Sequence, residues 1–182
     1  MFLLILLTRA CLLFSAGHPP DAGVFFRFKN HDFSLRAPMQ NSGGHYFPRG
    51  RLDNARLDTL SNWFDPQRHY VEIIRQDDAL HPGIGLALGF EFDETNGEYP
   101  YSPEQAVLEL KDFGWGGVAF SVHDTLNYTG VSNAVSDDLT VEIDSFRRDT
   151  IYGRFSGLLL SGAGPMAAIE NGRFKIGLYR KR

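Results

Sequence analysis

One short segment, residues 84–92, constrains the fold more than any other. Large apolar residues occupy every second position of it, and glycine, alanine or glutamate occupies the positions between. Side chains of a β-strand point alternately to opposite faces of a sheet, whereas a helix would scatter these positions around its circumference. The segment therefore predicts a strand with one fully apolar face. The small residues on the second face predict close packing there, against a facing sheet, which we favour, or against a bound ligand.

Further strands follow the same rule towards the C-terminus. Apolar and polar residues alternate in residues 140–144 and in residues 173–179, and the glycines in residues 151–160 predict a strand with a bulge or a sharp bend. Turn signals such as Asn96-Gly97 and Asn171-Gly172 recur between the apolar segments. Short strands at this spacing are typical of an antiparallel sandwich or barrel.

A hairpin is predicted near the start of the folded part. Residues 24–28 and 33–36 are rich in aromatic and apolar side chains, and residues 29–32 between them favour a turn. Fifteen phenylalanines and nineteen glycines also favour strands and tight turns over helices.

Signals for helices are few. Ser102-Pro103-Glu104-Gln105 has the form of a capping box with proline at the first helical position. Residues 106–111, however, alternate as a strand would, so residues 103–112 stay open between helix and strand. Residues 51–62 are a second candidate for a short helix. The fold class predicted is all-β, an antiparallel β-sandwich or small barrel with room for one or two short helices.

The N-terminal residues predict export. The apolar run of residues 2–16 is too short and too interrupted for a membrane-spanning helix, and Ser15-Ala16-Gly17 supplies the small residues of a signal-peptidase site. We expect an export signal at residues 1–17, a spacer at 18–23 and a single β domain at 24–182. The expected location is the periplasm, the outer membrane or the outside of the cell. Lipidation of Cys11 is an alternative, although Arg9 is unusual before a lipidated cysteine.

Charge and cysteine content narrow the expected partners. The net charge of −4 argues against a nucleic-acid binder, which would carry a basic surplus. Cys11 is the only cysteine, so the chain cannot form an internal disulfide. We expect an envelope component or a small ligand as partner, and membrane contact only through a lipid anchor.

The sequence contains no recognisable catalytic motif. The six histidines lack the spacing of a metal site on one element, and the HExxH, GxSxG, P-loop and GxGxxG patterns are missing. The acidic residues 93–98 lack the alternate-position ligands of an EF-hand loop and predict a solvated hairpin turn at Asn96-Gly97. No catalytic residue, metal or cofactor is therefore predicted.

Aromatic residues in loops are the candidates for ligand binding. Trp115 is flanked by Gly114, Gly116 and Gly117, which would expose its ring for stacking or let a core tryptophan sit at a tight bend. Tyr99-Pro100-Tyr101 and Asn62-Trp63-Phe64 raise the same alternatives, since aromatic loops also cover the ends of sandwiches. The candidate ligand-binding residues are Trp63, Tyr99, Tyr101 and Trp115.

The C-terminal third resembles a known type of protein. Its pattern is I-x-G-x-F-S-G-x-L, a loop and I-x-N-G-x-F, carried by Ile151, Gly153, Phe155, Ser156, Gly157, Leu159, Ile169, Asn171, Gly172 and Phe174. In this the chain resembles small envelope proteins and lipoproteins of Bacteroidota-type bacteria, mostly of unknown function, and residues 26–33 are similar to their opening hairpin. The resemblance implies a β-sandwich and brings no catalytic residues.

Three functional hypotheses follow. The leading one is a non-enzymatic, exported or envelope-associated β-sandwich module with a binding or structural role. The first alternative is a small β-barrel that carries an apolar ligand, because small barrels can enclose one ligand. The second is a hydrolase whose site is assembled from scattered residues, namely His69, Glu72, His123 and Asp124.

Overall fold

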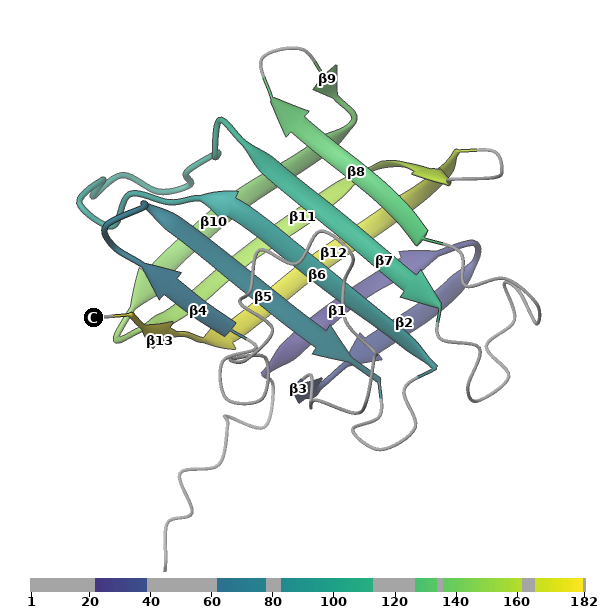
Figure 1. Ribbon diagram of the computed structural model, residues 1–182, viewed down its shortest axis with the longest axis horizontal. Helices are drawn as coiled ribbons and strands as arrows, with labels where there is room; N and C mark the ends of the chain where they lie inside the picture. Colours follow the sequence, from purple (N-terminus) through teal and green to yellow (C-terminus); the bar gives the residue numbers. More distant parts are fainter. Residues whose placement is uncertain are drawn as a thin grey trace, which may run out of the picture.

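The protein is all-β, as the sequence predicted, and its strands form two stacked layers (Figure 1). The computed structural model describes residues 22–38, 62–77, 83–112, 127–133, 136–161 and 166–181. No helix occurs within these ranges. The strands of the front and back layers run in crossing directions (Figure 1), and the sheets do not close into a barrel. Of the two predicted architectures, sandwich and barrel, the protein therefore adopts the sandwich.

The back layer, sheet A, is entirely antiparallel. In spatial order it consists of β10 (Leu139–Arg147), β11 (Thr150–Ser161), β12 (Ala167–Gly177), β1 (Gly23–Phe28) and β2 (His31–Leu35). The front layer, sheet B, consists of β13 (Tyr179–Arg180), β4 (Asn62–Asp65), β5 (Tyr70–Gln76), β6 (Ile84–Glu91), β7 (Ala106–Asp112) and β8 (Asn127–Asn133). β3 (Ala37–Pro38) pairs with β5 and β9 (Ser136–Asp137) with β8, and only β13 and β4 pair in parallel.

Three strands connect the layers at their corners. The far end of β11 leaves β10 and pairs with β8, through Leu160 and Thr129. β2 continues through Arg36 into β3, which lies on β5, and β12 continues through Leu178 into β13, which lies on β4. Segments distant in sequence are thus held together by backbone hydrogen bonds as well as by the core.

The predicted strand at residues 84–92 is confirmed, and its large residues form the centre of the core. Leu86 and Leu88 are fully buried between the sheets, and the ring of Phe90 lies 6.0 Å from that of Phe174 on β12. The facing sheet therefore packs on the large-residue side. The expectation that it would pack on the glycine and alanine side is wrong.

The glycine and alanine side of β6 belongs to the outer face of sheet B. There Gly89 lies opposite Glu72 of β5, and Ala87 lies opposite Glu109 of β7. Both carboxylate residues are buried, with exposed fractions of 7% and 8%. The small residues of β6 thus leave room for the longer side chains of its neighbours in the same sheet.

Two tight turns confirm hairpins. Lys29 and Asn30, between β1 and β2, have φ values of 47° and 65°, and Arg148 and Asp149, between β10 and β11, have 50° and 58°. Positive φ at both central residues is the type I′ geometry, whose twist matches that of the adjoining strands. The N-terminal hairpin is therefore formed as predicted.

The Asn171-Gly172 signal marks a bulge rather than a turn. Asn171 has a φ of 53° and lies inside the continuous strand β12. Phe155 of β11 pairs with Gly172 of β12, and Gly157 pairs with Ile169. Between these two pairs the chain advances two residues along β11 but three along β12. One extra residue therefore lies in β12, so the irregularity predicted for residues 151–160 is contributed by its partner strand.

The two candidate helices have different outcomes. Residues 106–112 form strand β7, with Leu108 and Leu110 fully buried, because pairing with β6 and β8 on both sides outweighs the local capping signal. Residues 51–61 lie outside the described ranges.

Removing a core side chain of β6 is expected to be costly. Leu88→Ala leaves a cavity between the sheets and should lower the free energy of unfolding by about 2–5 kcal/mol. Glu91→Gln, at the partly exposed end of the opposite face, is the control and should change it by less than about 0.5 kcal/mol. Urea unfolding curves measure both, and equal small losses would contradict the half-buried strand.

Candidate functional site

An open groove of about 480 Å³ lies on the outer face of sheet A. We call it the Phe25 groove. Its volume is in the range of small-ligand pockets, about 300–1,000 Å³. Its floor includes Gly153 and Phe174. The side chains that line it are Phe25, Arg36, Asp144, Tyr152, Arg173 and Lys175.

Strand alternation and register bring these side chains together. Val24 and Phe26 are buried in the core, so Phe25 between them points outward. Arg173 lies directly opposite Phe25 in the β1–β12 pair, and Lys175 lies opposite Tyr152 in the β11–β12 pair. The consecutive strands β11 and β12 and the sequence-distant strand β1 therefore contribute to one surface.

The ring of Phe25 holds two guanidinium groups. The guanidinium carbons of Arg36 and Arg173 lie 5.1 Å and 5.3 Å from its centroid. These distances are typical of cation–π contacts, which restrict a cationic side chain without neutralising it. The Nε of Arg36 also donates a hydrogen bond of 3.1 Å to the hydroxyl of Ser34. The Nζ of Lys175 lies 5.5 Å from the ring of Tyr152.

Positive charge is in excess in the groove. Among the described residues that line it, Asp144, the extra residue of a bulge in β10, is the only carboxylate, and it lies 3.6 Å from Arg154 just outside the groove. Arg154 also forms an ion pair with Glu142, and this hydrogen bond and the charge of Asp144 raise the pKa of Arg154. No carboxylate of the described ranges lies within ion-pair distance of Arg173. A chain with a net charge of −4 thus presents a locally cationic groove.

Two arginines face each other beside the groove. Arg154 and Arg173 are directly opposite in the β11–β12 pair, and both are exposed. Like charges at such positions destabilise a sheet. Arg154 is compensated by Glu142, while Arg173 is supported only by the ring of Phe25 among the described residues. The like-charge pair therefore leaves a repulsion at Arg173 that no described carboxylate offsets.

Among the candidate ligand-binding residues from the sequence, Trp63 is buried by neighbouring side chains. It is 2% exposed on β4, where Lys181 Nζ lies 3.3 Å from its ring centroid and the ring of Tyr70 lies 5.6 Å away. Its ring is therefore covered in this structure and lies on sheet B, away from the Phe25 groove.

Tyr99 and Tyr101 are half-buried against the core. The backbone of Tyr101 exchanges hydrogen bonds of 2.9 Å and 2.7 Å with Ile143, and its ring lies 6.0 Å from that of Phe92. Burial raises the pKa of both tyrosines. They cover the edge of the sandwich, which was the alternative interpretation of these loops. Trp115 and Cys11 lie outside the described residues.

The hydrolase candidates are not assembled by the described residues. His69 is exposed in the β4–β5 turn, and its Nδ1 lies 3.9 Å from the carboxylate of Asp93. Glu72 is buried on the outer face of sheet B. His123 and Asp124 lie outside the described ranges. Within those ranges no group of three His, Cys, Asp or Glu side chains has the arrangement of a metal site.

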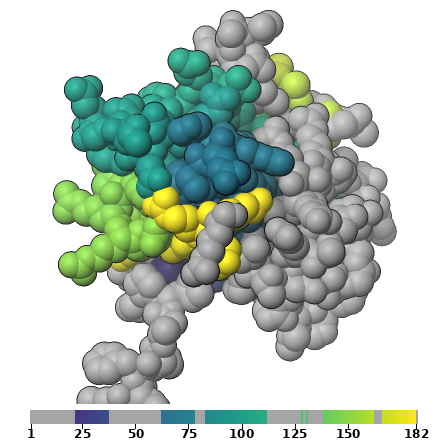
Figure 2. All heavy atoms as spheres, turned by 60° about the vertical axis from the view of Figure 1, so that its left-hand side comes forward, coloured from purple at the N-terminus to yellow at the C-terminus, as the bar shows by residue number. Residues whose placement is uncertain are grey.

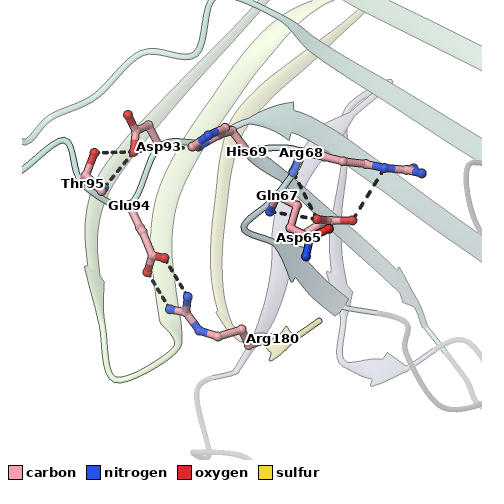
Figure 3. A network of polar contacts seen from close by, with 8 residues as sticks. All are labelled: Asp65, Gln67, Arg68, His69, Asp93, Glu94, Thr95 and Arg180. Atoms are coloured by element: carbon pink, nitrogen blue, oxygen red, sulfur yellow. Dashed lines mark hydrogen bonds and ion pairs between the residues drawn. The ribbon is translucent and has the colours of Figure 1, made fainter. Parts of the chain in front are cut away.

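The acidic residues after β6 form a structural network (Figure 3). Glu94 accepts two hydrogen bonds of 2.7 Å and 2.6 Å from Arg180 of β13, and Arg180 lowers the pKa of Glu94. Asp93 accepts hydrogen bonds from the amide and hydroxyl of Thr95, which lower the pKa of Asp93. The turn therefore lies at Glu94-Thr95 instead of the predicted Asn96-Gly97.

This network attaches the C-terminal strand. Figure 2 shows β13 in yellow between the blue β4–β5 hairpin and the light-green end of the β10–β11 hairpin. The amide of Leu178 donates to the carbonyl of Asp149 at 2.7 Å, and that of Lys181 donates to Phe64 at 2.9 Å. Its role is thus to hold the two layers together at one corner.

Comparisons with known proteins place the chain in no family. No protein-family model matches it, and neither a curated protein nor a solved structure matches it at a significant level. In the described ranges no helix has the length and apolar character needed to cross a membrane.

The Glu94–Arg180 pair predicts a pH-dependent contribution to stability. A carboxylate whose pKa is lowered in the folded state stabilises above its unfolded pKa, about 4.3, and loses that contribution as the pH falls through the folded value. At pH 7, Glu94→Gln should cost about 0.5–1 kcal/mol, since both side chains are about one-third exposed.

At about pH 3 the difference between Glu94→Gln and the parent should be smaller than at pH 7, because the contribution of the carboxylate is lost as the pH falls through its lowered folded pKa. Urea unfolding at the two pH values measures this. Glu98→Gln, in the same loop and exposed, is the control and should leave the free energy of unfolding unchanged at both pH values. An equal loss at pH 7 and pH 3 for Glu94→Gln would show that the ion pair is not its cause.

Proposed function

We propose that the protein is a non-enzymatic β-sandwich module that binds its ligand in the Phe25 groove. The observation that carries this proposal is the pair of guanidinium groups, from Arg36 and Arg173, placed on one aromatic ring in a groove with excess positive charge. Rigid, convergent donors on a sheet surface are what a binding site needs, because little conformational entropy is lost when the ligand arrives.

The side chains of the groove suit binding better than catalysis. Arginine remains protonated at physiological pH and cannot act there as a general base. Asp144, the one carboxylate, is directed to an ion pair with Arg154. Neither a histidine nor a cysteine is among the described residues that line the groove. The groove therefore offers hydrogen-bond donors, charge and aromatic surface, without a nucleophile activated by a neighbouring base.

The barrel carrier has less support than the groove. Phenylalanines that would line an apolar cavity pack against one another between the sheets, as in the contacts of Phe64 with Phe92 and of Phe155 with Phe174. The open Phe25 groove instead lies on the outer face of sheet A.

The cellular location is part of the same proposal. Residues 1–17 support export, with Cys11 as a potential lipidation site, and the C-terminal pattern supports kinship with small Bacteroidota-type envelope proteins. An exported binding module would meet its partner in the envelope or outside the cell. The partner is then a small ligand or an envelope component.

The location of the binding surface is tested by amide chemical-shift mapping. The probes are three hexasaccharides, one neutral (maltohexaose), one acidic (hexagalacturonate) and one cationic (chitosan hexamer). At least one should shift amides of β1, β11 and β12, and Phe25→Ala should abolish those shifts while the domain stays folded. Shifts centred on Trp63, or none with any probe, would contradict the proposal.

A further inference from the structure

We infer that the Phe25 groove binds an acidic saccharide, a sugar chain that carries carboxylate or sulfate groups. This inference rests on the proposed function and adds the chemical class of the ligand. It follows from three properties of the groove: the pairing of its backbone, the chemistry of its cations and the distribution of apolar side chains on the same face.

The backbone beneath the groove is already paired. β12 is hydrogen-bonded to β1 on one side and to β11 on the other, and β11 is hydrogen-bonded to β10 beyond. An extended peptide binds a sheet by adding a strand to a free edge, where main-chain groups are available. The middle of sheet A offers no such edge. Recognition here must therefore proceed through side chains, which disfavours a peptide and suits a ligand with charged substituents.

The cations match paired oxyanions. The planar guanidinium group binds carboxylate or sulfate through two parallel hydrogen bonds, which gives both affinity and orientation. Arg36 and Arg173 each lie about 5 Å from the same ring centroid, so the two groups are near neighbours on one surface. A ligand that carries charges on neighbouring sugar units can therefore contact both groups. Lys175, two residues after Arg173 on the same face of β12, supplies a third cation.

The aromatic residues suit the sugar itself. Tyr152 combines an apolar ring with a hydroxyl group that can donate and accept hydrogen bonds, which fits the mixed apolar and hydroxyl surface of a sugar. Gly153 beside it contributes only backbone to the groove, because a Cβ there would point into the core against the ring of Phe174.

A lipid surface is disfavoured by the distribution of apolar side chains. Among the described residues, the large exposed apolar side chains near sheet A are Leu158 and Leu160 of β11 and Met166 just before β12, with exposed fractions of 44%, 51% and 59%. They lie near the C-terminal end of β11 and the N-terminal end of β12. Tyr152 and Lys175 lie near the N-terminal end of β11 and the C-terminal end of β12. A bilayer would need cations and apolar anchors side by side.

The test is fluorescence anisotropy with labelled hexasaccharides. The probes are a heparin hexasaccharide (sulfated), hexagalacturonate (carboxylated) and maltohexaose (neutral), at 50 and 200 mM salt. At least one acidic probe should bind at least tenfold more tightly than maltohexaose, and more weakly at the higher salt. Arg173→Gln should weaken this binding at least tenfold, and Arg173→Lys by less.

Arg27→Gln is the matched control. Arg27 is an exposed arginine of the same sheet, but it lies opposite Asp32 and Glu170 outside the groove, so the change should alter affinity less than twofold. The urea midpoint of each variant should match the parent, which shows that losses of binding do not come from unfolding.

The other outcomes separate the two levels of the proposal. Equal binding of maltohexaose, lost in Phe25→Ala, would overturn the acidic-saccharide inference and leave the groove as a binding site. Tighter binding of a single-stranded oligonucleotide or of phosphatidylglycerol vesicles would overturn the ligand class in the same way. If no hexasaccharide binds, or if binding ignores Arg173, the inference fails, and shift mapping then decides whether the groove binds anything.

Discussion

The bulge in β12 is the constraint on which the core and the groove both depend. Because side chains alternate along a strand, Ile169 and Phe174, five positions apart, would face opposite ways in a regular strand. The extra residue at Asn171 brings both into the core, where they are 1% and 3% exposed. With Phe174 inward, alternation then places Arg173 outward in the groove. Gly172 completes the bulge, because a Cβ there would collide with the carbonyl and ring of Phe155.

Much of the fold could be predicted because the alternation of residue types along a strand shows which side chains belong to each of its two faces. The alternation in residues 84–92 and the pairing signals around Lys29-Asn30 are local, and both were confirmed. The side on which a second sheet packs is not local, and there the prediction for the small face of β6 was wrong. Asn171-Gly172 was misassigned as a turn because positive φ is needed by tight turns and by bulges alike.

The candidate site was harder to predict because it depends on the order of strands in space. Alternation alone places Phe25 and Arg173 outward, and an outward aromatic residue near a cation is a usable signal. Sequence cannot show that β1 lies beside β12, where paired residues such as Val24 and Phe174 are 150 positions apart in the chain. The aromatic residues around Trp63 predicted a ligand site, but in the structure Lys181 lies over its ring. An aromatic side chain in an apolar neighbourhood is a packing group until its exposure is known.

The most direct test of this account is the unfolding of two variants at the bulge. Asn171→Gly keeps the extra residue and adopts the positive φ more readily, so its urea unfolding should match the parent within about 0.5 kcal/mol. Deletion of Asn171 removes the extra residue, and a one-residue slip moves side chains to the wrong face along one end of β12. The account predicts that the deletion variant shows no cooperative unfolding transition. A cooperative transition of parental stability in that variant would contradict it.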